Sequence, residues 1–160
     1  MSKQEIKDEF KEMEGQPEVR QKIKQKQREM AEQRMLQDVP KADVIITNPE
    51  HFAVALKYDA DAGTAPILLA KGKGLIAQKI REIASENKIH LFEAPPLARA
   101  LYFTTEIGGF IPKALYVSVA QVIAYVYGLE ALKNEETKPD KPVPKVPKDY
   151  QFNEQGLTLN

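Results

Sequence analysis

The chain has 160 residues with 23 basic and 23 acidic side chains, two histidines and no cysteine. Balanced charge gives no electrostatic reason to bind nucleic acid or an anionic surface. The missing cysteines exclude disulfides and thiolate metal sites, and two histidines are too few for a histidine-rich metal site. We therefore expect no metal and no cofactor. Neither a signal peptide nor an apolar run of about 18 residues is visible, which by itself is typical of a soluble cytoplasmic protein.

Residues 1–40 are predicted to form a charged helical linker that is interrupted at 15–17. Apolar residues are too sparse there for a buried helix face. The run from Lys22 to Arg28 is the one candidate for binding nucleic acid or lipid headgroups. Because Glu29 and Glu32 follow at once, we favour a solvated helix face and predict no nucleic-acid partner.

Residues 41–130 are predicted to form a compact α/β domain, with a small mixed four-stranded sheet surrounded by helices. Short apolar runs and helical periodicity predict the elements. The strands are expected at 44–47, 52–56, 67–70 and 89–92, and the helices at 75–87, 95–105 and 113–127. Because a helix separates the third and fourth strands, a parallel crossover between them is expected.

Residues 131–160 are predicted to form a flexible tail rich in proline and lysine. The stretch KPDKPVPKVPKDY favours an extended, polyproline-type backbone. Two interpretations stay open for this tail: it binds a groove in a partner, or it remains disordered.

Four residues stand between the first two strands: Asn48, Pro49, Glu50 and His51. Asn and Pro are favoured at the first two positions of a turn. Pro49 cannot take the positive φ that the best hairpin turns need, so we expect a strained turn or a wider loop. In a tight hairpin, Asn48 and His51 would face each other with Cβ atoms about 5 Å apart.

This tetrapeptide has a specific chemistry. Because Pro49 has no N–H, it cannot attack the Asn48 side chain. The reverse attack is open: the side-chain nitrogen of Asn48 can attack its own carbonyl carbon and expel the Pro49 nitrogen, which leaves a succinimide. This step needs a strained turn or a base such as His51. Taken alone, the tetrapeptide is more typical of an ordinary turn beside a solvated histidine.

The wider stretch ADVIITNPEHFAVALKYD resembles the cytoplasmic domain of the FlhB/YscU family, whose motif is Asn-Pro-Thr-His between two strands. The resemblance covers roughly residues 1–129 and is closer to the flagellar branch. It continues in separated blocks: MSKQEIKDEF and EGQPEVR, then Ala65-Pro66, Ala70-Lys71-Gly72, EAPPLARALY from Glu93, and Ile111-Pro112. This sequence departs from the motif at Glu50, where the family has Thr.

The resemblance implies a self-cleaving switch protein at the export gate of a flagellum or type III secretion system, on the cytoplasmic face of the bacterial inner membrane. Asn48 would cyclise, Pro49 would leave and His51 would act as the base, in a single-turnover autoproteolysis. The cleaved fragment would stay associated, and cleavage would take part in switching export-substrate specificity. Partners would be other gate proteins, export substrates or chaperones, and the membrane through a missing N-terminal transmembrane part.

Glu50 leaves alternatives open. Its carboxylate would favour a protonated His51 and so weaken it as a base, or serve as a base itself, or replace the hydrogen bonds of Thr. The competing hypothesis is a non-cleaving interaction module of the same export gate, in which Glu50 has disabled or slowed the cut.

Overall fold

The computed structural model describes residues 16–132 and 137–159. The chain forms two units, of which the first ends at Arg34 and the second is Met35–Asn160. As far as it is described, the first unit is the larger part of helix α2 (Pro17–Asp38). The helix predicted before Gly15 lies outside the described residues.

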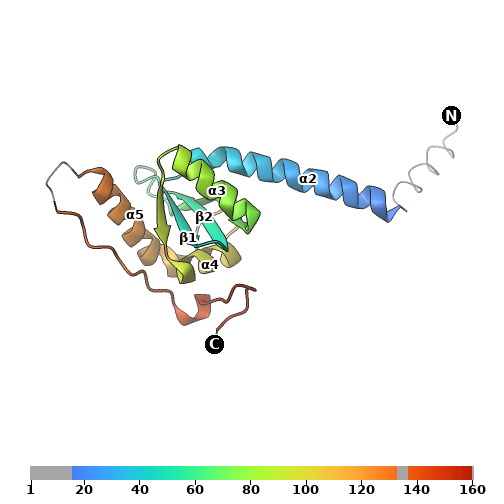
Figure 1. Cartoon of the computed structure of the whole chain (residues 1–160). Helices are drawn as coiled ribbons and strands as arrows, with labels where there is room; N and C mark the ends of the chain where they lie inside the picture. The colour runs from blue at the N-terminus through green and yellow to red at the C-terminus, as the bar shows by residue number, and fades with distance from the viewer. Residues whose placement is uncertain (1–15, 133–136, 160) are drawn as a thin grey trace. The chain divides into compact units, whose positions relative to one another are not determined.

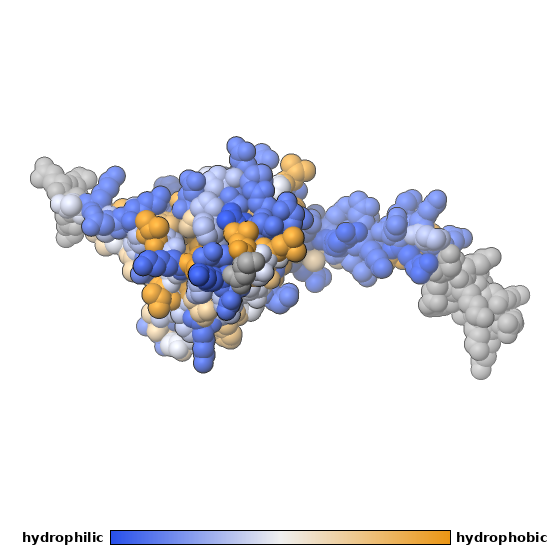
Figure 2. Space-filling model, turned by 90° about the horizontal axis from the view of Figure 1, so that it is seen from below, coloured by the Kyte–Doolittle hydropathy of each residue, from blue (hydrophilic) through white to orange (hydrophobic). Residues whose placement is uncertain are grey.

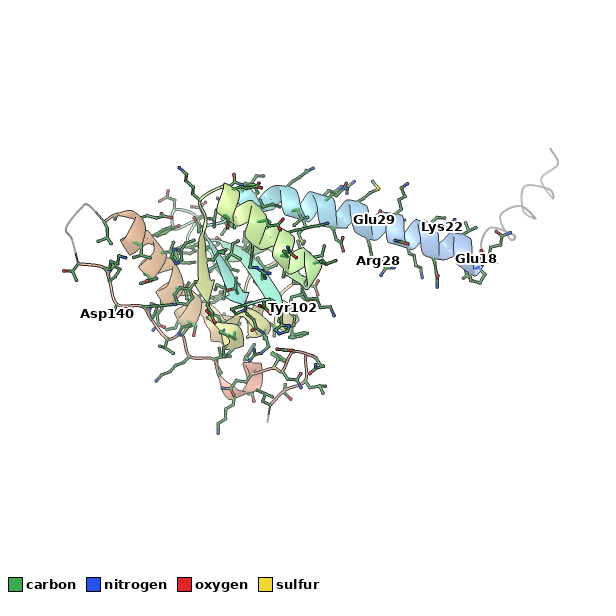
Figure 3. All side chains as sticks on the ribbon, viewed as in Figure 1. Glu18, Lys22, Arg28, Glu29, Tyr102 and Asp140 are labelled. Atoms are coloured by element: carbon green, nitrogen blue, oxygen red, sulfur yellow. The ribbon has the colours of Figure 1, made fainter. Side chains whose placement is uncertain are left out.

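The surface of α2 is hydrophilic along the part that belongs to the first unit (Figure 2). Charged side chains of both signs project from it, as Glu18, Lys22, Arg28 and Glu29 show in Figure 3. Nearly all of its side chains up to Arg34 are exposed. This pattern is typical of a solvated helix. In the described residues, no helix is both long enough and apolar enough to cross a membrane.

The second unit is built on a mixed four-stranded sheet with strand order β3-β2-β1-β4 (Figure 1). The four strands are β1 (Val44–Asn48), β2 (Phe52–Lys57), β3 (Ile67–Lys73) and β4 (His90–Glu93). Strand β2 is antiparallel to both β1 and β3, whereas β4 is parallel to β1. The predicted small mixed sheet of four strands is confirmed.

Helices cover both faces of this sheet: α3 (Leu75–Glu86), α4 (Pro95–Thr104) and α5 (Tyr116–Glu130). Ile45 packs in one core cluster with α3 and the end of α2. Its neighbours Val44 and Ile46 pack in the other cluster, with α4 and α5. Successive residues of a strand point to opposite faces, so a strand covered on both faces is apolar throughout.

The tail from 137 onward packs against this domain. Ser118 Oγ of α5 donates a hydrogen bond to the Lys145 carbonyl oxygen. The Lys141 ammonium lies 5.1 Å from the centre of the Phe92 ring. Val146 packs against the core beside α4 and α5, ahead of a short 3-10 helix (Lys148–Tyr150). The sequence did not predict these contacts.

The start of the hairpin is fastened to α5 through one carboxylate. Asp43 Oδ2 accepts a 2.6 Å hydrogen bond from the Tyr58 N–H. Tyr127 of α5 also hydrogen-bonds to Asp43. Burial, this hydrogen bond and the Asp43 charge together raise the pKa of Tyr127 from 10.0 to about 12.

This pKa makes stability depend on pH at the alkaline end. The neutral phenol is favoured in the folded state, so its contribution is complete below pH 10 and is lost as the pH rises from 10 to about 12. Urea denaturation across this interval should therefore show a larger loss of stability for the parent than for Tyr127→Phe. Equal losses of stability in the two chains would contradict the prediction.

Candidate functional site

The tetrapeptide at 48–51 closes a tight turn. The His51 N–H donates a 3.0 Å hydrogen bond to the Asn48 carbonyl oxygen. Glu50, the third residue of the turn, has a φ of 74°. Pro in the second position and a positive φ in the third are the pattern of a type II turn. Of the two expectations, a strained turn or a wider loop, the backbone of Glu50 agrees with the first.

The strain is located at Glu50. A residue with a Cβ atom pays roughly 1–2 kcal/mol for a left-handed backbone, and such a residue persists only where its surroundings impose it. Here both arms impose it. The Gly74 N–H donates a 3.0 Å hydrogen bond to the His51 carbonyl oxygen, and the Ala94 N–H donates one of 2.9 Å to Thr47, one residue before the turn.

Asn48 is the last residue of β1 and is only 6% exposed. Among the described residues, its buried Nδ2 has no hydrogen-bond partner. Leaving a buried donor unpaired costs about 1–3 kcal/mol, so this nitrogen is not stabilised where it lies. It is also not held away from the backbone by another acceptor.

The carbonyl group of Asn48 is the complementary half of the site. Its oxygen already accepts the hydrogen bond from the His51 N–H. A donor placed on a carbonyl oxygen stabilises the negative charge that develops there during attack on the carbon. One residue therefore supplies both an unpaired nitrogen and a polarised carbonyl.

His51 lies on the solvent side of the turn, with 55% of its side chain exposed. The register pairs Asn48 with Phe52, so the expectation that Asn48 and His51 face each other across the hairpin is wrong. A loop of three residues between the paired positions moves His51 off the strand. Its Nε2 lies 3.5 Å from Oε1 of Glu154 in the tail, a contact that sequence reasoning missed.

Aromatic packing holds the second arm of the turn in place. The Phe52 ring is buried, with its centre 4.8 Å from that of Tyr102 and 5.6 Å from that of Phe103, both on α4. Lys71 of β3 donates hydrogen bonds of 2.9 and 2.8 Å to the Tyr102 and Thr105 carbonyl oxygens. Burial lowers the pKa of Lys71 from 10.5, against the opposing charge of Glu106. Strands β2 and β3 are thereby fastened to α4.

An apolar cavity of about 520 Å³ lies apart from the turn, between α5 and the loop after β2. Small and aromatic side chains line it, among them Tyr58, Ala65, Pro66, Ala120, Ala124 and Tyr127. The only sequence signal for it is the spacing of Ala120 and Ala124, which places two small side chains on one face of a helix. Within the described part of the chain, no group of acidic and histidine side chains could hold a metal ion.

Comparison with known proteins identifies the family to which the chain is similar. The model of the FlhB HrpN YscU SpaS family matches residues 1–126. The flagellar biosynthetic protein FlhB of Salmonella typhimurium is 58% identical over 130 residues, which are 81% of this chain and 34% of that protein. The FlhB of Yersinia enterocolitica is 56% identical over 135 residues, or 84% and 35% of the two chains. The chain spans about a third of the length of the curated relatives it matches.

Solved structures show the same fold. The cytoplasmic domain of FlhB from Shewanella putrefaciens is 44% identical with a TM-score of 0.69, covering 76% of this chain and 95% of that one. An EscU C-terminal domain is 30% identical with a TM-score of 0.55, covering 57% of this chain and 98% of that one. The chain therefore belongs to the FlhB/YscU family, and its globular part has the α/β fold of the family's cytoplasmic domains.

Proposed function

We propose that this chain is the cytoplasmic part of a flagellar-type protein export component, and that it cleaves itself between Asn48 and Pro49 and takes part in switching export-substrate specificity. It would act at the cytoplasmic face of the bacterial inner membrane, joined to a transmembrane part. The observation that carries the proposal is the turn itself: a buried Asn48 Nδ2 that has no hydrogen-bond partner in the described part of the chain, beside a carbonyl whose oxygen is already hydrogen-bonded.

Cleavage proceeds by cyclisation of Asn48. Its Nδ2 attacks its own backbone carbonyl carbon and forms the five-membered succinimide ring. The bond from that carbon to the Pro49 nitrogen breaks, and the electron pair of the bond goes to nitrogen. The proton lost by Nδ2 is balanced by the proton gained by Pro49, which becomes a secondary amine. The His51 N–H stabilises the negative charge that forms on the carbonyl oxygen.

His51 is proposed as the group that transfers this proton. A neutral imidazole can accept the proton and then deliver it to the leaving nitrogen. Pro49 and Glu50 separate His51 from the scissile bond, and the exposed side chain of His51 is free of the packed core. Release of the left-handed backbone at Glu50 adds a driving force, since that strain ends when the turn opens.

The two fragments would stay together after the cut. Strand β1 ends at Asn48, and its buried residues pair with β2 on one edge and β4 on the other. Removing β1 would expose both core clusters at once. Cleavage would therefore change the loop and leave the fold unchanged.

Intact mass under denaturing conditions tests the proposal. The purified chain should give two fragments, 1–48 and 49–160, and Asn48→Ala should give one intact mass. In His51→Ala, cleavage should be slower on the order of 10²-fold, because the proton transfer loses its catalyst. Circular dichroism should show the same fold for all three. A single intact mass for the parent after long incubation near neutral pH would favour the non-cleaving module.

Substitutions at Glu50 separate backbone strain from charge. Glycine takes a positive φ freely, so Glu50→Gly should slow cleavage. In an Asn48→Ala background it should raise the free energy of unfolding by about 1 kcal/mol. The matched control is Glu50→Ala, which removes the carboxylate and keeps the Cβ atom. Glu50→Thr restores the family residue and should cleave at least as fast as the parent. Equal stabilisation by Gly and Ala would show that charge, and not strain, distinguishes this position.

A second candidate function is docking of an export substrate in the apolar cavity. The cavity is large enough for a few apolar side chains, and aromatic and small side chains line it. Ala120 and Ala124 are exposed on α5, so substitutions there leave the buried stripe of that helix unchanged. This docking does not depend on cleavage, and it fits the alternative of an interaction module.

Ala124→Glu tests the docking. A carboxylate in the cavity should weaken binding of a purified rod or hook subunit at least about tenfold, because the apolar contact would bury an unpaired charge. Binding can be followed by fluorescence anisotropy of the labelled subunit. The control is Gln121→Glu, which places the same charge on an exposed position outside this cavity. Equal binding by the parent and Ala124→Glu would exclude the cavity as the docking site.

A further inference from the structure

The last described residues fold into a small hook, 151–159. The Asn153 Oδ1 accepts backbone hydrogen bonds of 2.9 Å from Gln155 and from Leu157. Gly156 has a φ of 85°, which lets the chain reverse. A turn closed by an asparagine side chain and a left-handed glycine is determined locally by its sequence. Glu154 occupies the tip of this turn.

The hook is seated on α4 by three different kinds of contact. Arg99 Nε donates a 2.7 Å hydrogen bond to the Phe152 carbonyl oxygen. The centres of the Phe103 and Phe152 rings are 5.7 Å apart. The backbone of Gly156 lies so close to Phe103 that an added Cβ atom would be 2.8 Å from the ring. This close approach leaves room only for glycine at that position.

The residue that follows the turn at 48–51 packs against the same helix. Phe103 contacts Phe52, the residue directly after His51, so one ring touches both the hook and the hairpin. The docked hook places Glu154 Oε1 at 3.5 Å from His51 Nε2. Both side chains are about half exposed, at 46% and 55%, so burial does not force them together. The contact follows from where the hook is docked.

A carboxylate beside Nε2 has a specific effect on a histidine. In a neutral ring, a carboxylate beside Nε2 favours the tautomer whose hydrogen is on Nε2, so that the lone pair lies on Nδ1. Nδ1 is bonded to the ring carbon that joins the side chain to the backbone, so it is the ring nitrogen nearer to the turn. The carboxylate also limits the directions in which an exposed ring can turn. Both effects would leave the unprotonated nitrogen on the part of the ring that is nearer to the backbone of the turn.

We propose that Glu154 is a positioning residue for His51, and that the C-terminal hook thereby accelerates cleavage between Asn48 and Pro49. This inference rests on the proposed function. The hook belongs to the same chain, so the control is intramolecular and depends on the hook being docked on α4. Glu154 acts through His51 and touches neither Asn48 nor the leaving nitrogen.

Pulse-chase labelling in cell-free translation measures the cleavage rate from the moment of synthesis. Glu154→Gln should slow cleavage about tenfold, a part of what a general base contributes. Glu154→Asp should retain part of the rate. In a His51→Ala background, Glu154→Gln should have no further effect, which a merely structural role would not produce. The control is Glu86→Gln, which removes an exposed carboxylate from α3.

Nuclear magnetic resonance of the uncleaved Asn48→Ala chain tests the contact without cleavage. Nuclear Overhauser effects should join the His51 ring protons to the Glu154 methylene protons. They should disappear in Phe152→Ala, which weakens docking of the hook, and persist in Val143→Ala, whose side chain is 87% exposed.

The outcomes separate the two proposals. If the parent cleaves and the Glu154→Gln variant cleaves as fast or faster, the positioning role would be overturned and the cleavage proposal would stand. Equal slowing in the His51→Ala background would overturn it too. A parent that stays intact while the Overhauser effects are present would overturn the proposed cleavage, and would leave the contact as a structural one.

Discussion

The burial of β1 is the constraint on which the rest of the structure depends. All five of its residues are buried, β2 and β4 occupy its two edges, and helices cover both faces. Asn48 is the last of these residues, so its side-chain amide nitrogen is buried without a hydrogen-bond partner among the residues that the structure describes. The chain must then reverse within three residues to reach Phe52. The left-handed backbone of Glu50 follows from that short connection between two fixed strands.

The site therefore has a rigid inner side and an open outer side. On the inner side, Phe52 is packed on α4, and Lys71 fastens β3 to the carbonyl oxygens at the end of the same helix. A cation there is also favoured by the helix dipole. On the outer side, His51 is exposed and meets the tail. The proposed nucleophile, Asn48 Nδ2, and its carbonyl are held in place by the fold, whereas the proposed base contacts a segment about a hundred residues later in the chain.

Features that depend on neighbouring residues could be predicted from the sequence, whereas contacts between distant parts of the chain could not. Continuous apolar runs, β-branched in β1 only, predicted β1 and β2 almost to the residue, since such runs suit strands covered on both faces. The last helix begins at Tyr116 rather than at 113, because a 3-10 turn (Lys113–Leu115) precedes it. The predicted hairpin register was wrong by one residue, because the pattern of apolar residues does not determine the length of the loop. The tail contacts were missed because Ser118 and Arg99 bind backbone carbonyl oxygens, which every residue carries.

A cut at the turn would act on one side of the site only. Asn48 would stay at the end of a buried strand, whereas Pro49, Glu50 and His51 would become the start of the second fragment. The hook and α4 belong to that same fragment, so the cut would separate His51 from Asn48 without separating it from Glu154. The new amino terminus would consequently remain beside the hook while it loses its turn hydrogen bond and its strained backbone. If cleavage alters how the domain contacts export substrates, the alteration would have to arise from this short segment and the tail next to it. The sheet and both core clusters would keep their contacts.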